Sequence, residues 1–206
     1  MMISSCNRRT AMITCTGPVS PDDLTALMRA VNTISIPVFL DMSGCTGITE
    51  LGDYSIDPVT GICTSPFYNS IKLSGISLPR SVTKIGKFAF LQCTALKKAV
   101  LPEGLKSIGK AAFGVCISLS AVKIPQSVTD ISDSAFGICT SLAAVTIPSG
   151  IQNIGKDAFS FCSSLESVSM PDSAVTVSKD AFRYCANLDQ HVLMQNAASQ
   201  AASVIK

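Results

Sequence analysis

Five cysteines stand at one fixed interval, and they are the residues in this chain whose type and spacing could do chemistry. They lie 23 residues apart, at Cys93, Cys116, Cys139, Cys162 and Cys185. A column of thiols could bind a metal ion, form disulfides or supply a nucleophile. The interval is not Cys-x-x-Cys, however, and the chain has a single histidine, His191. The spacing therefore predicts no zinc site. The sequence also offers no general base that would activate one of these thiols as a nucleophile.

A longer repeated unit must position these thiols. Prolines, Ala-Phe pairs and leucines keep the same interval, and the unit reads Leu-x-x-Val-x-Ile-Pro-x-x-Val-x-x-Ile-Gly-x-x-Ala-Phe-x-x-Cys. A fixed period of about 20 to 29 residues with leucine at set offsets is the signature of leucine-rich repeats. Each unit is therefore predicted to be one coil of a solenoid.

Stacking the coils places equivalent residues above one another, about 4.8 Å apart. That distance is close to what a disulfide needs, but stacked residues have parallel Cβ vectors, which suit the bond poorly. We therefore interpret the thiols as small side chains that fill an inward turn position. No catalytic residue, metal site or cofactor is predicted, and the alternative is a metal- or redox-responsive protein that uses the cysteine column.

The Ile-Gly-x-x-Ala-Phe-x-x-Cys segment closely resembles the BspA-like leucine-rich repeat family, above all its treponemal members. The resemblance covers roughly residues 56–193. It implies a solenoid and a non-catalytic scaffold for protein–protein interaction, and several such proteins are surface adhesins. It does not imply an enzyme.

The expected fold is a leucine-rich-repeat solenoid with a parallel β-sheet on its concave face and short irregular or 3-10 segments on the other side. Opposite the sheet, a spine of phenylalanines is predicted at Phe67, Phe90, Phe113, Phe136, Phe159 and Phe182. Residues 1–54 should form an N-terminal segment, residues 55–193 the array of 23-residue repeats, and residues 194–206 a C-terminal tail.

The N-terminal segment should contain a capping helix. Ser20-Pro21-Asp22-Asp23 has a side-chain cap, a proline in the first turn and two acids at the positive end of the helix dipole. Apolar residues follow at helical spacing and should cover the open end of the solenoid. Residues 38–42 alternate as a strand, residues 43–51 form an irregular first repeat, and residues 52–66 read as an inserted loop.

Two outward surfaces are candidate binding sites. On the sheet, the outward positions begin at Ser74, Gly75 and Ser77, and the candidate partner-binding residues are Lys97, Lys98, Val100, Ala121, Lys123, Ala144, Thr146, Ser167 and Ser169. The residue before each cysteine grows in bulk along the array, and the candidate self-association residues are Val115, Ile138, Phe161 and Tyr184. If exposed, this second set would form an apolar stripe suited to a homo-oligomer.

The charges are unevenly distributed, although the net charge is only +2. Residues 72–123 hold nine Lys and Arg against one acid, and residues 124–190 hold three against seven. This layout suits an acidic protein partner or pairing between molecules. Nucleic acid is excluded because the basic part lacks interleaved aromatic residues, and no run reaches the roughly 18 apolar residues of a membrane span.

The first fifteen residues lack the apolar stretch of a secretory signal. The sequence as it stands therefore predicts a cytoplasmic protein. If a leader was removed, the alternative is a surface or secreted protein.

Overall fold

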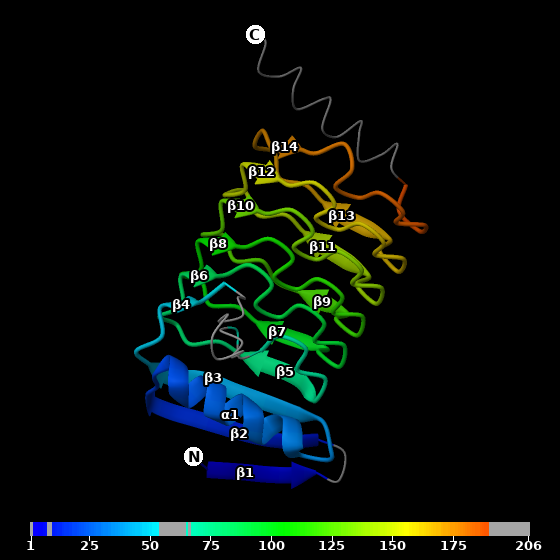
Figure 1. Cartoon of the computed structure of the whole chain (residues 1–206). Coiled ribbons are helices and arrows are strands. Elements are labelled where there is room, and N and C mark those ends of the chain that lie inside the picture. Colours follow the sequence, from blue (N-terminus) through cyan, green and yellow to red (C-terminus); the bar gives the residue numbers. More distant parts are fainter. Residues whose placement is uncertain (1, 8–9, 54–64, 66, 190–206) are drawn as a thin grey trace, which may run out of the picture.

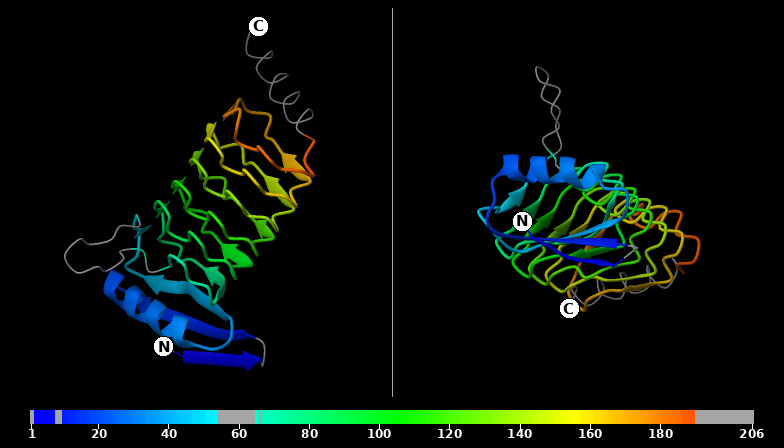
Figure 2. Two further views of the ribbon diagram at one scale, coloured as in Figure 1. Left: turned by 45° about the vertical axis from the view of Figure 1, so that its right-hand side comes forward. Right: turned by 90° about the horizontal axis from the view of Figure 1, so that it is seen from below.

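Two ladders of short parallel strands run along the molecule and form the two walls of a solenoid (Figure 1). The structure is a computed structural model, and it describes residues 2–7, 10–53, 65 and 67–189. The coils stack along one axis, with the N-terminal strands and the helix at one end (Figure 2). The predicted solenoid is therefore confirmed.

The first ladder begins with three long strands and continues with one short strand from each coil. The long strands are β1 (Met2–Asn7), β2 (Thr10–Pro18) and β3 (Val38–Thr46). The coils contribute β5 (Leu73–Ser77), β7 (Lys98–Val100), β9 (Ala121–Val122), β11 (Ala144–Thr146) and β13 (Ser167–Ser169). The strands of this ladder up to β9 form one sheet, and β11 and β13 form a separate two-stranded sheet on the same wall. From β5 to β9 and from β11 to β13, paired residues lie one 23-residue period apart, as Lys98 and Ala121 do.

The second ladder lies on the other wall, where the sequence predicts irregular or 3-10 segments. Here the structure has two-residue parallel strands followed by turns: β4 (Glu50–Leu51), β6 (Lys84–Ile85), β8 (Ser107–Ile108), β10 (Asp130–Ile131), β12 (Asn153–Ile154) and β14 (Thr176–Val177). The glycine after β6 lies in close contact with the preceding coil. A Cβ on Gly86 would lie 2.6 Å from the carbonyl oxygen of Leu51 in the preceding coil. Only glycine fits this contact without a backbone shift.

Between the walls, the predicted phenylalanine spine is present. The six rings stack face to face with centroids 4.9–5.3 Å apart, and the five rings from Phe67 to Phe159 are fully buried. Burying such a side chain contributes roughly 1.5–3 kcal/mol. The spine therefore links each coil to its neighbours along the whole array.

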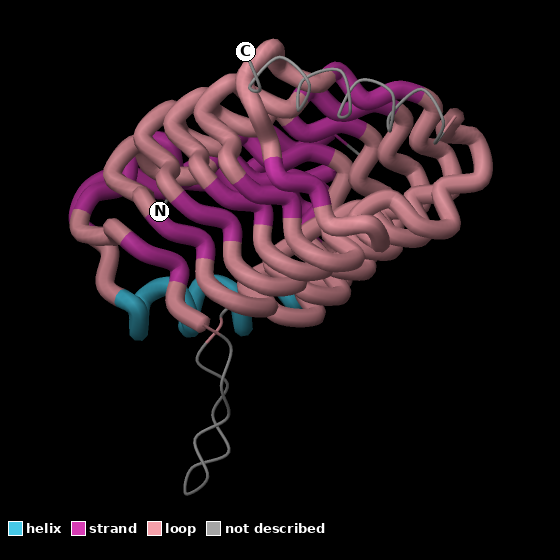
Figure 3. The backbone as a smooth tube through the Cα atoms, turned by 90° about the horizontal axis from the view of Figure 1, so that it is seen from above, coloured by secondary structure: helices cyan, strands magenta, loops and turns pink. Residues whose placement is uncertain are grey.

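The predicted capping helix is α1 (Pro21–Thr33). Ser20 accepts a hydrogen bond from the Asp23 amide, and the Asp23 carboxylate accepts one from the Ser20 amide, which is a capping box. Leu24, Met28 and Val31 are buried in the common core. Viewed from above, α1 lies at the edge of the stack (Figure 3).

Strands β1 and β2 are not anticipated by the sequence. They form an antiparallel pair, and β2 also pairs in parallel with β3, so that α1 connects two neighbouring strands. The end of the first ladder is therefore extended by a hairpin, in addition to the helix. Within the described residues no helix has the length and apolar character needed to cross a membrane.

Part of the predicted organisation falls outside the described residues. The tail 194–206, His191 and residues 54–64 of the inserted loop belong there. The domain boundaries at 54 and 193 stay predictions.

Candidate binding surfaces

The outer face of the first ladder, from β7 to β13, is called the sheet face. Its strands alternate regularly: Lys98 and Val100 are exposed, and Ala99 between them is buried. All nine candidate partner-binding residues named from the sequence are exposed on it: Lys97, Lys98, Val100, Ala121, Lys123, Ala144, Thr146, Ser167 and Ser169. The structure thus brings these residues together on one surface.

The chemistry of the sheet face changes along its length. Lys97 and Lys98 lie at its N-terminal end, and Lys123 of the next coil forms a 2.6 Å ion pair with Glu103. Further on, the face carries alanine, threonine and serine, and Glu166 is exposed near its C-terminal end. The face therefore has a basic end and a neutral to acidic end.

The sheet face has an N-terminal limit that sequence reasoning missed. Gly75 of β5 is buried, although its position points outward, because the ring of Phe39 in β3 covers it. A Cβ on Gly75 would overlap this ring. A glycine inside a strand often marks such a close approach, so Gly75 could have indicated from the sequence that a neighbouring side chain covers this position.

The second surface is the left-handed column, which comprises Val115, Ile138, Phe161 and Tyr184. Each has a positive φ, between 58° and 62°. The last three are exposed by 41%, 44% and 62%, whereas Val115 is half-buried. Most of the predicted apolar stripe therefore lies at the surface.

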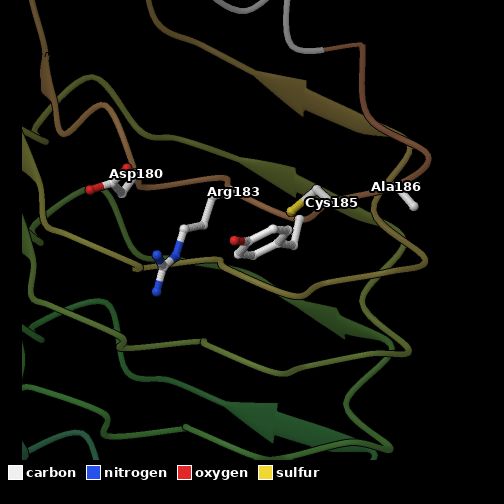
Figure 4. Close-up of a pocket in the computed structure, with 5 residues that line it drawn as sticks. Asp180, Arg183, Cys185 and Ala186 are labelled. Atoms are coloured by element: carbon white, nitrogen blue, oxygen red, sulfur yellow. The ribbon is translucent and has the colours of Figure 1, made fainter.

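The left-handed column ends in an aromatic pair. The rings of Phe161 and Tyr184 stack with centroids 4.6 Å apart. Arg183 lies over the Tyr184 ring at 5.4 Å and forms an ion pair with Asp157. Figure 4 shows Asp180, Arg183 and Cys185 along this coil, with Arg183 between the other two. These contacts hold the exposed Tyr184 ring in place.

The cysteine column is buried in the turns behind the left-handed column. Its five thiols are at most 3% exposed, and each donates a hydrogen bond to a phenylalanine carbonyl 26 residues earlier, as Cys139 does to Phe113 at 3.3 Å. Burial raises the pKa of Cys93 and of Cys139 to about 12 and that of Cys116 well above its usual value. These three thiols are therefore protonated at neutral pH and shielded from reagents.

Metal binding was the other chemistry open to the thiols. Within the described part of the chain, no three His, Cys, Asp or Glu side chains are grouped closely enough to hold a metal ion. The five cysteines of the column are free, with each thiol engaged by a backbone carbonyl of the preceding coil. The arrangement of the described thiols builds a core.

A family model described as a BspA type leucine rich repeat region, with six copies, matches residues 60–189. The chain belongs to the BspA-type leucine-rich repeat family. The resemblance seen in the Ile-Gly-x-x-Ala-Phe-x-x-Cys segment is thereby confirmed. The sixth copy in this BspA-type array is the coil in which Ser70 takes the place of the cysteine.

Solved structures of bacterial leucine-rich repeat proteins share this fold. A T. pallidum leucine-rich repeat protein is 26% identical, with a TM-score of 0.60 over 94% of this chain and 89% of that one. A protein from Bacteroides ovatus is 34% identical, with a TM-score of 0.55 over 60% of this chain. The match covers 32% of the Bacteroides protein, so the BspA-type chain spans about a third of that protein's length.

A leucine-rich cell surface protein from Faecalibacterium prausnitzii is 24% identical, with a TM-score of 0.56 over 91% of this chain and 51% of that one, which shows the fold alone. No curated protein sequence matches the BspA-type chain.

Two open hollows flank the BspA-type array, and sequence reasoning named neither. One lies on the last described coil, between Asp180, Arg183 and Tyr184. The other lies between β2 and α1, next to Cys15 and Asp23. The first lies beside Tyr184, the last member of the left-handed column.

Proposed function

We propose that the chain is a non-catalytic scaffold that binds an acidic protein segment along its sheet face. The observation that carries this proposal is the exposure of the candidate residues on one regular surface, with Lys97 and Lys98 together at its N-terminal end. Solenoids bind partners on extended concave surfaces, the face on which the sequence predicts this sheet, and membership of the family supports a binding role.

The charges define the chemistry of the partner. Lys97 and Lys98 are neighbours on one coil, and Lys123 extends the positive end to the next coil, where Glu103 partly offsets it. Val100 adds an exposed apolar contact beside them. A segment with two or more carboxylates and an adjacent apolar side chain would match this end of the sheet face.

The thiol chemistry gives no support to a catalytic or redox function. Cys93, Cys116 and Cys139 are buried and protonated, so they lack the thiolate that nucleophilic attack or metal binding requires. The same burial explains them as packing residues. A scaffold therefore accounts for these three thiols without any further function.

The test uses fluorescence polarisation to compare how tightly the parent and two variants bind a short fluorescein-labelled Glu-Ser repeat peptide. Reversing Lys97 and Lys98 to Glu together should weaken binding at least about tenfold, because like charges then face the peptide. The control reverses Lys84 and Lys106 to Glu. These residues lie in or beside the second ladder, and this double variant has the same net charge.

The two variants separate a site from a general charge effect. The control should bind the peptide nearly as tightly as the parent, and a Lys-Ser repeat peptide of the same length should not bind the parent. Equal losses in both variants would show that only net charge matters and would refute the sheet face as the site.

A further inference from the structure

The backbone of the left-handed column is unusual for the residues it contains. Val115 and Ile138 have φ values of 58° and 62°. Positive φ is a genuine outlier for β-branched residues and persists only where the surroundings impose it. Positive φ also recurs at a second position of each coil, at Phe88, Ala111, Ser134 and Asp157, so it belongs to the turn geometry of the repeat and does not by itself mark a functional position.

The coil stacking imposes this conformation. The Val115 amide donates to the Gly137 carbonyl at 2.8 Å, and the Ile138 amide donates to the Ser160 carbonyl at 2.8 Å. Each hydrogen bond joins one coil to the next, so the fold fixes the backbone whatever side chain is present. Gln92 occupies the same position one coil earlier with a φ of 63°, which shows that a polar side chain suits it.

The side chains themselves contribute little to the fold. Ile138, Phe161 and Tyr184 are 41–62% exposed, and asparagine or glycine would adopt the same backbone at lower cost. A protein that keeps strained, bulky and exposed residues in a row has a use for them outside its own core. An exposed apolar row of this kind is typical of an association site.

We infer that the left-handed column is a two-fold interface between two copies of this chain, packed antiparallel. This surface is separate from the sheet face and does not depend on the function proposed for it. A second copy is the partner that offers the same coil-to-coil spacing, so its side chains can interdigitate along the whole row.

The gradient of side-chain size selects the antiparallel arrangement. With the two-fold axis between the coils of Ile138 and Phe161, Val115 faces Tyr184 of the second copy, and Ile138 faces Phe161. The smallest residue then meets the largest, and the gap between the molecules keeps a constant width. A parallel arrangement would place Tyr184 on Tyr184 and leave a wedge at the other end.

The exposed charges five residues before each column member do not select the register by themselves, because the outer coils place Lys110 of one copy opposite Lys179 of the other. The inner coils give the opposite-charge pair. Asp133 and Lys156 are exposed, and each stands five residues before a member of the column, Ile138 or Phe161. The two-fold axis places Asp133 of each copy opposite Lys156 of the other, which gives two ion pairs. The Asp133 carboxylate is already held in position, because it accepts a hydrogen bond from the Lys156 amide of its own chain at 2.9 Å.

The first experiment measures self-association of the full chain by sedimentation velocity and thermal stability at a concentration where it is monomeric. The parent should dimerise in the micromolar range. Ile138→Asn should weaken the dimer at least about tenfold and raise the Tm of the monomer by at least about 2 °C, since asparagine tolerates positive φ. A residue that only packed the fold would lose stability instead.

Val100→Asn is the matched control, because Val100 is also 41% exposed but lies on the sheet face. It should leave self-association unchanged. A monomeric parent, a dimer unaffected by Ile138→Asn, or a dimer lost in Val100→Asn alone would each overturn the inference. The last result would assign self-association to the sheet face, and the peptide assay tests that surface independently.

A charge exchange then tests the register. Lys156→Asp places like charges opposite each other twice and should weaken the dimer, and adding Asp133→Lys should restore it. A double variant that associates no better than Lys156→Asp, at equal Tm, would overturn the antiparallel register.

Discussion

At the scale of single residues, the buried thiols act as hydrogen-bond donors that join one coil to the preceding one. Cys139 shows the pattern: its Sγ lies 3.3 Å from the Phe113 carbonyl oxygen, and the side chain is fully buried. Neutral thiols suit this position because they are small and weakly polar. Their ionisation is therefore coupled to folding.

This coupling predicts a loss of stability at alkaline pH. The pKa of Cys139 is about 12 in the folded chain against 9.0 for a free thiol, so the stabilising contribution is complete below pH 9.0 and is lost as pH rises from 9.0 towards 12. At about pH 10 the loss is roughly 1.4 kcal/mol for this thiol. Cys139→Ser, whose hydroxyl does not titrate there, should lose less stability between neutral pH and pH 10 in urea unfolding.

Ser70 is the natural precedent for this substitution, since it occupies the cysteine position one coil before Cys93 and is fully buried. We expect Cys139→Ser to fold at neutral pH with a modest loss of stability. Identical pH dependence in the parent and the variant would show that the thiol pKa is not linked to folding.

The backbone conformation of single residues is one property that the sequence does not predict. The repeat predicted that Ile138, Phe161 and Tyr184 could form a surface stripe, because their position in the unit is known. It did not predict their positive φ, because valine, isoleucine and phenylalanine carry no preference for that conformation. The hydrogen bonds between coils, which the sequence does not show, impose it.

At the scale of elements, the coil is the unit that holds the molecule together. Phe136 is fully buried between Phe113 and Phe159, with centroids 5.3 Å away on both sides. Phe136→Ala should therefore lower the free energy of unfolding by about 3–5 kcal/mol. Phe182 is 7% exposed, so changing it to alanine should lower the free energy of unfolding by less.

Urea denaturation followed by circular dichroism would measure both variants. A larger loss at Phe182 than at Phe136 would contradict a core whose cooperativity depends on having coils on both sides.

Elements that repeat were predicted well, and elements that occur once were not. The alternation of apolar residues over 38–42 correctly predicted β3, and the N-cap at Ser20 correctly predicted α1. Strand β2 also alternates, with Ala11 and Ile13 buried, but the pattern is short and has no copy elsewhere in the chain. The two-residue strands of the second ladder are too short for any sequence pattern to reveal.

At the scale of the whole molecule, the hairpin of β1 and β2 protects an edge of the first ladder. Strand β2 pairs with β3 along most of its length and buries Ala11 and Ile13. A chain that begins at Ser20 would expose the β3 edge, and exposed edges pair with other molecules. We expect this truncated chain to form large aggregates in light-scattering measurements and to have a lower Tm than the parent.

The truncated chain keeps α1 and the coils, so its size and Tm test whether the helix alone is sufficient. A truncated chain with the parent's size and Tm would show that α1 alone is a sufficient cap, as the sequence had suggested.

The hydrogen bonds of each coil in the array reach only to the coil before it and the coil after it, as those of Val115 and Ile138 do. This locality has an evolutionary consequence. Duplication or deletion of the gene segment that encodes one coil would lengthen or shorten the array without disturbing distant contacts. An event between residues 97 and 166 would also shift the spacing between Lys97 and Glu166 on one surface and the length of the apolar row on another. Partner choice in such a lineage could then change by whole coils, and point substitutions would serve to refine it.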